Sequence, residues 1–210
     1  MPDARGHGQS SAPLHGYRYE DHARDVVALI DRLGLVAPVL LGHSMGGMTA
    51  AVVAAQPAAG IGGVILADPT FIGARRQRDV RDSDVAEQHR RMLGLDKNAV
   101  LAELRARHPH RSAEIVDLLA EARLQTRMSA FDVLTPPNPD YRELVRAIQV
   151  PIVLIAGDAG VVSLETAREL QGLNPRLRIE HIPNAGHGIQ FDQPERFEAV
   201  VKAFLLALSP

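Results

Sequence analysis

The fold is decided by residues 38–55, which read PVLLGHSMGGMTAAVVAA. The apolar start of this stretch predicts a short strand, and its Ala-rich end predicts a helix. Between them stands Gly42-His43-Ser44-Met45-Gly46, in which glycine lies two positions from the serine on either side. A serine so placed is typical of a nucleophile elbow, a turn that admits only small residues at the flanking positions. The pattern predicts that Ser44 is a nucleophile held at the end of a strand, with a helix N-terminus behind it.

The rest of the chain alternates between apolar runs and helical patterns. Further strands are predicted at residues 63–67, 152–156 and 177–182, with helices at residues 20–33, 164–170 and close to the C-terminus. Strands that are apolar throughout and alternate with helices are typical of a parallel sheet covered on both faces. We therefore expect an α/β fold with a mostly parallel sheet. Local signals predict Ser163 as a helix N-cap and Asp192 with Glu195 as a capping box.

Residues 70–149 differ in character from the rest of the chain. They are charged, contain no convincing strand, and show helical patterns at residues 84–93, 99–107, 112–124 and 141–148. We expect a helical cap here, inserted into a core formed by residues 1–69 and 150–210. Such an insertion commonly covers an active site and shapes its pocket. A helical layer without that role is the alternative.

A serine hydroxyl needs a base to become a nucleophile at neutral pH, and the base needs a carboxylate to orient it. Because the carboxyl ends of parallel strands meet at one edge of the sheet, candidates should lie just after strands. Asp158 and His187 do so, and the order Ser44, Asp158, His187 is the nucleophile–acid–base order of α/β-hydrolases. Asp68 also follows a strand, and it remains an alternative to Asp158 as the carboxylate.

Four motifs resemble successive landmarks of the α/β-hydrolase fold family, most closely its capped, alpha/beta-hydrolase-1 type members. They are Asp3-Ala4-Arg5-Gly6-His7-Gly8-Gln9-Ser10, Gly42-His43-Ser44-Met45-Gly46-Gly47, Gly157-Asp158 and Asn184-Ala185-Gly186-His187. The resemblance covers essentially the whole chain but is weak across the cap. It implies that Ser44 is the nucleophile, His187 the general base and Asp158 the orienting carboxylate. The backbone N–H of Met45 would be one oxyanion donor.

The serine at the elbow also narrows the chemistry that the resemblance implies. Family members that open epoxides or displace halide carry a carboxylate at this position. We therefore expect acyl transfer on a small carboxylic ester, lactone or related acyl substrate, through an acyl-enzyme that water hydrolyses. Within enzymes, a C–C bond hydrolase or a cofactor-free perhydrolase is the alternative. Outside enzymes, the alternatives are a non-catalytic relative that binds a small molecule and an inactive fragment.

The first landmark begins at Asp3, whereas in the family it lies at the end of the fourth strand of an eight-stranded sheet. The resemblance thus implies an N-terminally shortened hydrolase without the loop that normally supplies the second oxyanion N–H. Loss of one oxyanion-hole donor lowers the reaction rate by about 10²–10³-fold. The elbow strand would also have an open edge, which invites pairing with another chain. A homodimer through this edge is therefore a further expectation.

Composition excludes several other classes of function. The chain has 210 residues, is 46% hydrophobic, carries a net charge of −2 and has no cysteine. This balance predicts a globular protein that binds neither nucleic acid nor an anionic membrane. No apolar run is long enough to span a membrane or resembles a signal peptide, so we expect a cytoplasmic protein. His108-Pro109-His110 is too weak a pattern for a metal site, and we expect neither metal nor cofactor.

Overall fold

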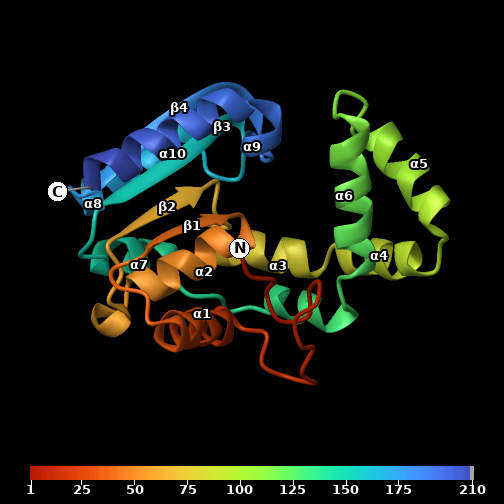
Figure 1. The fold of residues 1–210 in the computed structure, drawn as a ribbon, viewed down its shortest axis with the longest axis horizontal. Coiled ribbons are helices and arrows are strands. Elements are labelled where there is room, and N and C mark those ends of the chain that lie inside the picture. Colours follow the sequence, from red (N-terminus) through yellow and green to blue (C-terminus); the bar gives the residue numbers. More distant parts are fainter. Residues whose placement is uncertain (209–210) are drawn as a thin grey trace. The chain divides into compact units, whose positions relative to one another are not determined.

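A computed structural model describes residues 1–208 and contains one four-stranded parallel sheet (Figure 1). The strands are β1 (Val39–His43), β2 (Gly63–Ala67), β3 (Ile152–Ala159) and β4 (Leu177–Gly186), and they lie side by side in chain order. Each of the strands expected from the apolar runs is present. The expected α/β class with a mostly parallel sheet is confirmed.

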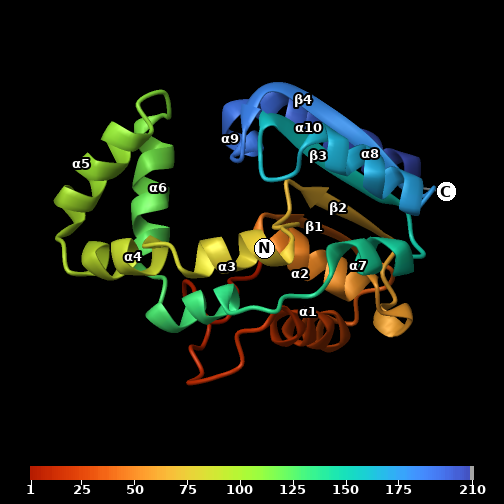
Figure 2. The same ribbon diagram turned by 180° about the vertical axis from the view of Figure 1, so that it is seen from behind.

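Helices cover both faces of this sheet (Figures 1 and 2). One face carries α2 (Met45–Ala54), α7 (Tyr141–Ala147) and α8 (Leu164–Leu173), which contact one another in series. Right-handed crossovers between strands that follow one another in a single direction place the connecting helices on the same face. The opposite face carries α10 (Pro194–Leu208), while α1 (Tyr19–Leu33) packs on α2. The short helices η1 (Pro57–Ala59) and α9 (Ile189–Asp192) complete this part of the chain.

The core lies between the sheet and its helices. Every residue of β2 is buried, because both faces of this central strand are covered. Ile65, Val153 and Ile155 point to the face where Phe204 of α10 packs. Burial on both faces explains why the strands are unbroken apolar runs rather than alternating patterns.

β1 lies at an edge of the sheet, since among the described strands it pairs only with β2. Leu41 in this strand is 48% exposed. The expectation of an open edge beside the elbow is confirmed. Pairing of this edge with a second copy stays a prediction.

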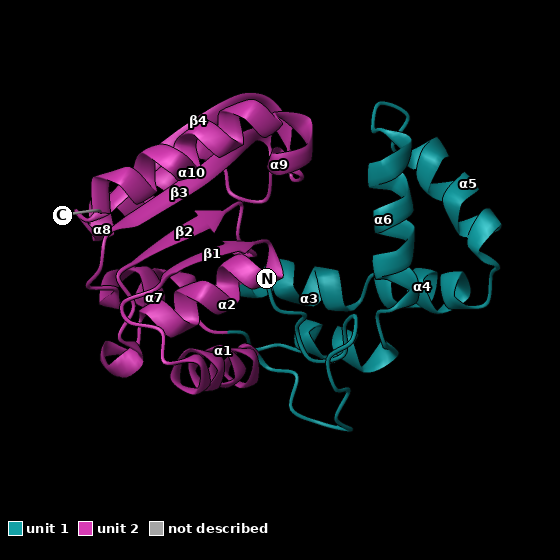
Figure 3. Ribbon diagram, in the orientation of Figure 1, with its two compact units in different colours: residues 1–18, 74–138 teal, residues 19–73, 139–210 magenta. Residues whose placement is uncertain are grey.

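The chain divides into two compact units, coloured separately in Figure 3. The sheet unit comprises residues 19–73 and 139–210, and the helical unit comprises residues 1–18 and 74–138. The helical unit contains α3 (Ala74–Arg81), α4 (Val85–Leu93), α5 (Lys97–Arg107), α6 (Ala113–Leu124) and η2 (Met128–Leu134). Its small core is formed by Met92, Val100, Leu104, Val116 and Ala120.

These boundaries differ from the expected ones at the N-terminal segment and at both ends of the helical insertion, which spans residues 74–138 rather than 70–149. The N-terminal segment groups with the helical unit, where the N–H of Arg127 donates to the carbonyl of Gly6 and Ser129 donates to Tyr17. α7 groups with the sheet unit, because it packs on α2 and α8 and its Tyr141 stacks on Phe71. The expectation that the helical segment covers an active site stays a prediction.

Two local details also differ from the sequence analysis. α3 was not expected, since its sequence ARRQRDVR shows no apolar periodicity. The capping box is wrong, because α10 begins at Pro194 and the carboxylate of Asp192 instead accepts a hydrogen bond from the N–H of Gly186. No helix among residues 1–208 combines the length and apolarity needed to cross a bilayer.

Candidate active site

Ser44 stands in the sharp turn between β1 and α2, with backbone angles φ 55° and ψ −119°. A non-glycine residue in this region is strained and persists only where its surroundings hold it. Here the N–H of Ser44 donates to the carbonyl of Ala67, and the N–H groups of Met48 and Thr70 donate to the carbonyl of Ser44, each at 3.1 Å. The main chain is thus fixed on both sides, as a nucleophile elbow requires.

Glycine is needed at two places in this turn. A Cβ on Gly42 would lie 2.1 Å from the carbonyl oxygen of Gly46, so only glycine allows the chain to pass itself there. A Cβ on Gly47 would lie 2.8 Å from the side chain of Pro69. Gly46, in contrast, has open space around its Cβ position. The second tight position is therefore Gly47 and not Gly46, which corrects the expectation from the motif.

His187 follows the end of β4 and lies against Ser44, as expected from the sequence. The hydroxyl of Ser44 donates to Nε2 of His187 over 2.9 Å. The Nδ1–H of His187 donates to Oδ2 of Asp68 over 2.5 Å. This tautomer is the one that leaves Nε2 free to accept the serine proton.

The carboxylate on His187 belongs to Asp68, so the expectation that Asp158 orients the histidine is wrong in this structure. Asp68 follows β2, the neighbour of the elbow strand, and the register pairs His43 with Ala67. This places the end of β2 beside the serine. Asp158 lies at a register shift in β3, between Gly157 and Ala159, and its side chain is turned toward β4.

Asp68 is fully buried and is held by backbone groups from the turn after β3. The N–H of Val161 donates to Oδ2 and the N–H of Val162 donates to Oδ1, both at 2.9 Å. A Cβ on Gly160 would lie 2.6 Å from Oδ1 and 2.7 Å from Oδ2 of Asp68. The carboxylate therefore occupies the space that a side chain at position 160 would need.

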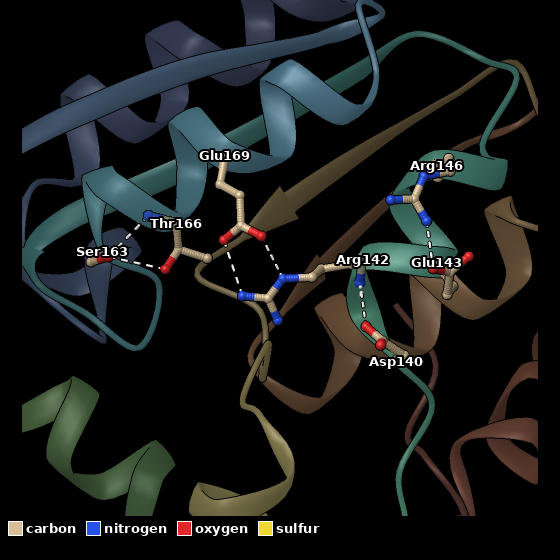
Figure 4. Close-up of polar contacts among 7 residues, drawn as sticks. All are labelled: Asp140, Arg142, Glu143, Arg146, Ser163, Thr166 and Glu169. Carbon is tan, nitrogen blue, oxygen red and sulfur yellow. Dashed lines mark hydrogen bonds and ion pairs between the residues drawn. The ribbon is translucent and has the colours of Figure 1, made fainter.

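The turn that supplies these two amides runs directly into α8 (Figure 4). The hydroxyl of Ser163 accepts from the N–H of Thr166, which confirms the predicted N-cap. Arg142 of α7 forms a paired contact with Glu169 of α8, with distances of 2.5 Å and 3.0 Å. The cap therefore fixes the start of α8, directly after the two amides that bind Asp68, and the ion pair joins α7 to the middle of α8.

Asp158 has partners of its own. Its Oδ1 lies 2.7 Å from Nε2 of His181, and its Oδ2 accepts from the N–H of Asn184 at 2.6 Å. The pKa of Asp158 is lowered, first because the Asn184 N–H stabilises the carboxylate and second because His181 does. Asn184 has a positive φ of 58°, so Asp158 supports a strained turn on the path to His187.

His43, the residue before the serine, also contacts the histidine. Its Nε2 lies 2.7 Å from the backbone carbonyl oxygen of His187, and the two ring centroids are 4.7 Å apart. The pKa of His43 is lowered, chiefly because the ring is removed from water.

Met45 is the first residue of α2, so its N–H has no carbonyl to bond within the helix. This donor follows the serine directly and is the expected position of one oxyanion contact. Within residues 1–208, no group of three or more His, Asp or Glu side chains is arranged to hold a metal ion.

The chain is similar to known proteins along almost its whole length. A family model described as alpha/beta hydrolase fold matches residues 1–194. N-formylmaleamate deformylase of Pseudomonas putida is 30% identical over 97% of this chain and 76% of its own. 3-Oxoadipate enol-lactonase 2 of Acinetobacter baylyi is 32% identical over 96% of this chain and 78% of its own. The solved structure of a thermophilic esterase from Thermogutta terrifontis matches with a TM-score of 0.78 and 26% identity, over 100% of this chain and 79% of that one.

Proposed function

This chain belongs to the alpha/beta hydrolase fold family, and on that premise we propose that it is a serine hydrolase of small carboxylic esters, lactones or related acyl compounds. The observation that carries the proposal is the continuous hydrogen-bond chain from Ser44 through His187 to Asp68. The three relatives described above support the substrate class, since they are named for a deformylase, an enol-lactonase and an esterase.

In the proposed first half-reaction, Oγ of Ser44 attacks the substrate carbonyl carbon while Nε2 of His187 takes the serine proton. The oxyanion that forms is stabilised by the N–H of Met45 at the positive end of α2. The tetrahedral intermediate collapses, the C–O or C–N bond of the leaving group breaks, and His187 returns the proton to the departing atom. The product is an acyl ester on Ser44.

In the second half-reaction, water takes the place of the leaving group. His187 removes one proton from the water as its oxygen attacks the acyl carbon, and it returns that proton to Oγ of Ser44 as the acid departs. Asp68 remains ionised throughout. Its task is to hold the Nδ1–H tautomer of His187 and to stabilise the imidazolium that forms in each step.

The first test is covalent labelling with a fluorophosphonate probe, which reacts with activated serines and needs no knowledge of the substrate. We expect the wild-type chain to be labelled and Ser44→Ala to be unlabelled. Ser83→Ala is a matched control, because its exposed hydroxyl donates to the carbonyl of Val80 in α3. Hydrolysis of p-nitrophenyl acetate, an enol-lactone and a simple formamide would then rank the leaving groups. A folded wild-type chain that is neither labelled nor active on any of the three would refute the proposal.

A further inference from the structure

The hydrogen bond between His43 and the main chain of His187 has a defined donor and a defined acceptor. A backbone carbonyl can only accept hydrogen bonds, so the Nε2 atom of His43, 2.7 Å from the carbonyl oxygen of His187, must carry the proton. The two rings are also adjacent, with an interplanar angle of 39°. His43 therefore holds the main chain of His187 from the side of β1, the strand that leads into Ser44.

Other side chains hold the segment just before His187. Asp158 accepts from the N–H of Asn184, Asp192 accepts from the N–H of Gly186, and Gln193 donates to the carbonyl of Asn184. These contacts fix the path of the chain up to the histidine. The bond from His43 instead acts on the carbonyl of His187 itself, the residue whose ring must reach Ser44.

We infer that His43 is a positioning residue for His187. Its Nε2–H anchors the His187 carbonyl so that the imidazole ring spans the gap between Oγ of Ser44 and Oδ2 of Asp68. Both ring contacts of His187 are short, 2.9 Å and 2.5 Å, so a small displacement of the main chain lengthens one of them. The effect of this anchor on reaction rate rests on the proposed function, whereas its effect on the geometry of His187 does not.

The ionisation of His43 is consistent with this role. Burial lowers the pKa of His43 most strongly, and the charge of His187 lowers it further, while the bond to the His187 carbonyl and the charge of Asp68 raise it. The balance keeps the ring neutral near pH 7. A neutral His43 keeps its donor on Nε2 and adds no repulsion when His187 becomes an imidazolium during turnover.

A pair of substitutions separates the hydrogen bond from the packing of the ring. His43→Phe keeps an aromatic ring but has no donor, and His43→Gln places an amide N–H close to the position of Nε2. We expect His43→Phe to lower kcat on p-nitrophenyl acetate by about 10- to 100-fold, with KM changed by less than about twofold, because a misplaced general base affects the chemical step. His43→Gln should recover most of this loss.

A second readout needs no turnover. The imidazole resonances of His187 can be followed by ¹H–¹⁵N NMR at a fixed pH, with His187→Asn used to assign them. We expect His43→Phe to alter the Nδ1–H and ring ¹⁵N signals of His187, and His43→Gln to restore both. A merely structural role would lower the melting temperature and leave these signals unchanged.

The two arms also separate the inference from the proposed function. An inert wild-type chain in which His43→Phe still shifts the His187 signals would refute the proposed function and support the anchor. If the wild-type chain is labelled and active, and His43→Phe matches it in kcat and in the His187 NMR signals, the anchor is overturned and the proposed function stands.

Discussion

Replacing Asp68 by asparagine should remove most of the activity, because the buried carboxylate sets the tautomer of His187. Asp68 accepts three N–H groups, from His187, Val161 and Val162, and it is 0% exposed. An asparagine has a single acceptor oxygen and two N–H donors. If its oxygen takes the place of Oδ1 and accepts from the N–H of Val162, its NH₂ group takes the place of Oδ2, where it faces Nδ1 of His187 and forces the proton to Nε2. That tautomer cannot accept the proton of Ser44.

The expected loss in kcat is about 10³–10⁴-fold, which corresponds to about 4–5 kcal/mol of transition-state stabilisation. Asp158→Asn is the matched comparison, since it makes the same change at the residue that the sequence favours. Asp158 is exposed and contacts His181 and Asn184 rather than His187. An asparagine there keeps one acceptor oxygen for the Asn184 N–H, so we expect a loss of less than about tenfold.

The assay is kcat/KM on p-nitrophenyl acetate, with the rate of fluorophosphonate labelling as a second measure. Thermal unfolding of each variant establishes that the protein compared is folded. The assignment of Asp68 would be refuted by an Asp68→Asn variant that is folded and within about tenfold of wild type. An Asp158→Asn variant that loses as much activity as Asp68→Asn would refute it equally.

Three other predictions follow from the same contacts. Gly160→Ala should lower kcat by about 10- to 100-fold, because the added Cβ would lie 2.6 Å from Oδ1 of Asp68. Gly172→Ala is the control, since it lies at an open position in α8 and should leave kcat unchanged. Asn174 is 2% exposed and its side-chain amide donates to two backbone carbonyls. Asn174→Ala should therefore reduce the free energy of unfolding by about 2–4 kcal/mol, measured by urea titration. An unchanged urea midpoint would contradict this. The pKa of Asp158 is lowered in the folded chain, so its stabilising contribution is present above the unfolded pKa of about 3.9 and is lost as the pH falls through the lower folded value. The urea midpoints of wild type and Asp158→Asn should accordingly differ at pH 7 and converge in acid, and a constant difference would argue against it.

Much of the fold is readable from local patterns in the sequence. Uninterrupted apolar runs predict buried parallel strands, and the chain has them at the expected places. Helix α3 escaped prediction because a solvated, charged helix has no apolar stripe to reveal it. The contact of Ser44 with His187 was also predictable, because each residue carries a local signal, glycines around the serine and a strand end before the histidine.

The identity of the carboxylate and the role of His43 were not decided by such signals. Asp68 and Asp158 both follow apolar runs in the sequence, and the rule that strand ends meet at one edge applies equally to both. The selection of Asp68 depends on strand adjacency, on the register shift at Asp158, and on the absence of a side chain at Gly160. A bond from a side chain to a backbone carbonyl, as His43 makes, leaves no mark in the sequence.

The sequence by itself determined a parallel α/β chain with a serine elbow and a histidine able to reach it, because turns and strands depend on residues close together along the chain. Only the tertiary structure decided which aspartate holds His187, since that choice depends on which side chains from β2, β3 and β4 occupy the same few ångströms. At Asp68 this space is dry and contains three N–H donors, whereas at Asp158 the carboxylate is exposed and points to His181. The carboxylate that contacts His187 therefore comes from the end of β2, the strand next to the elbow strand.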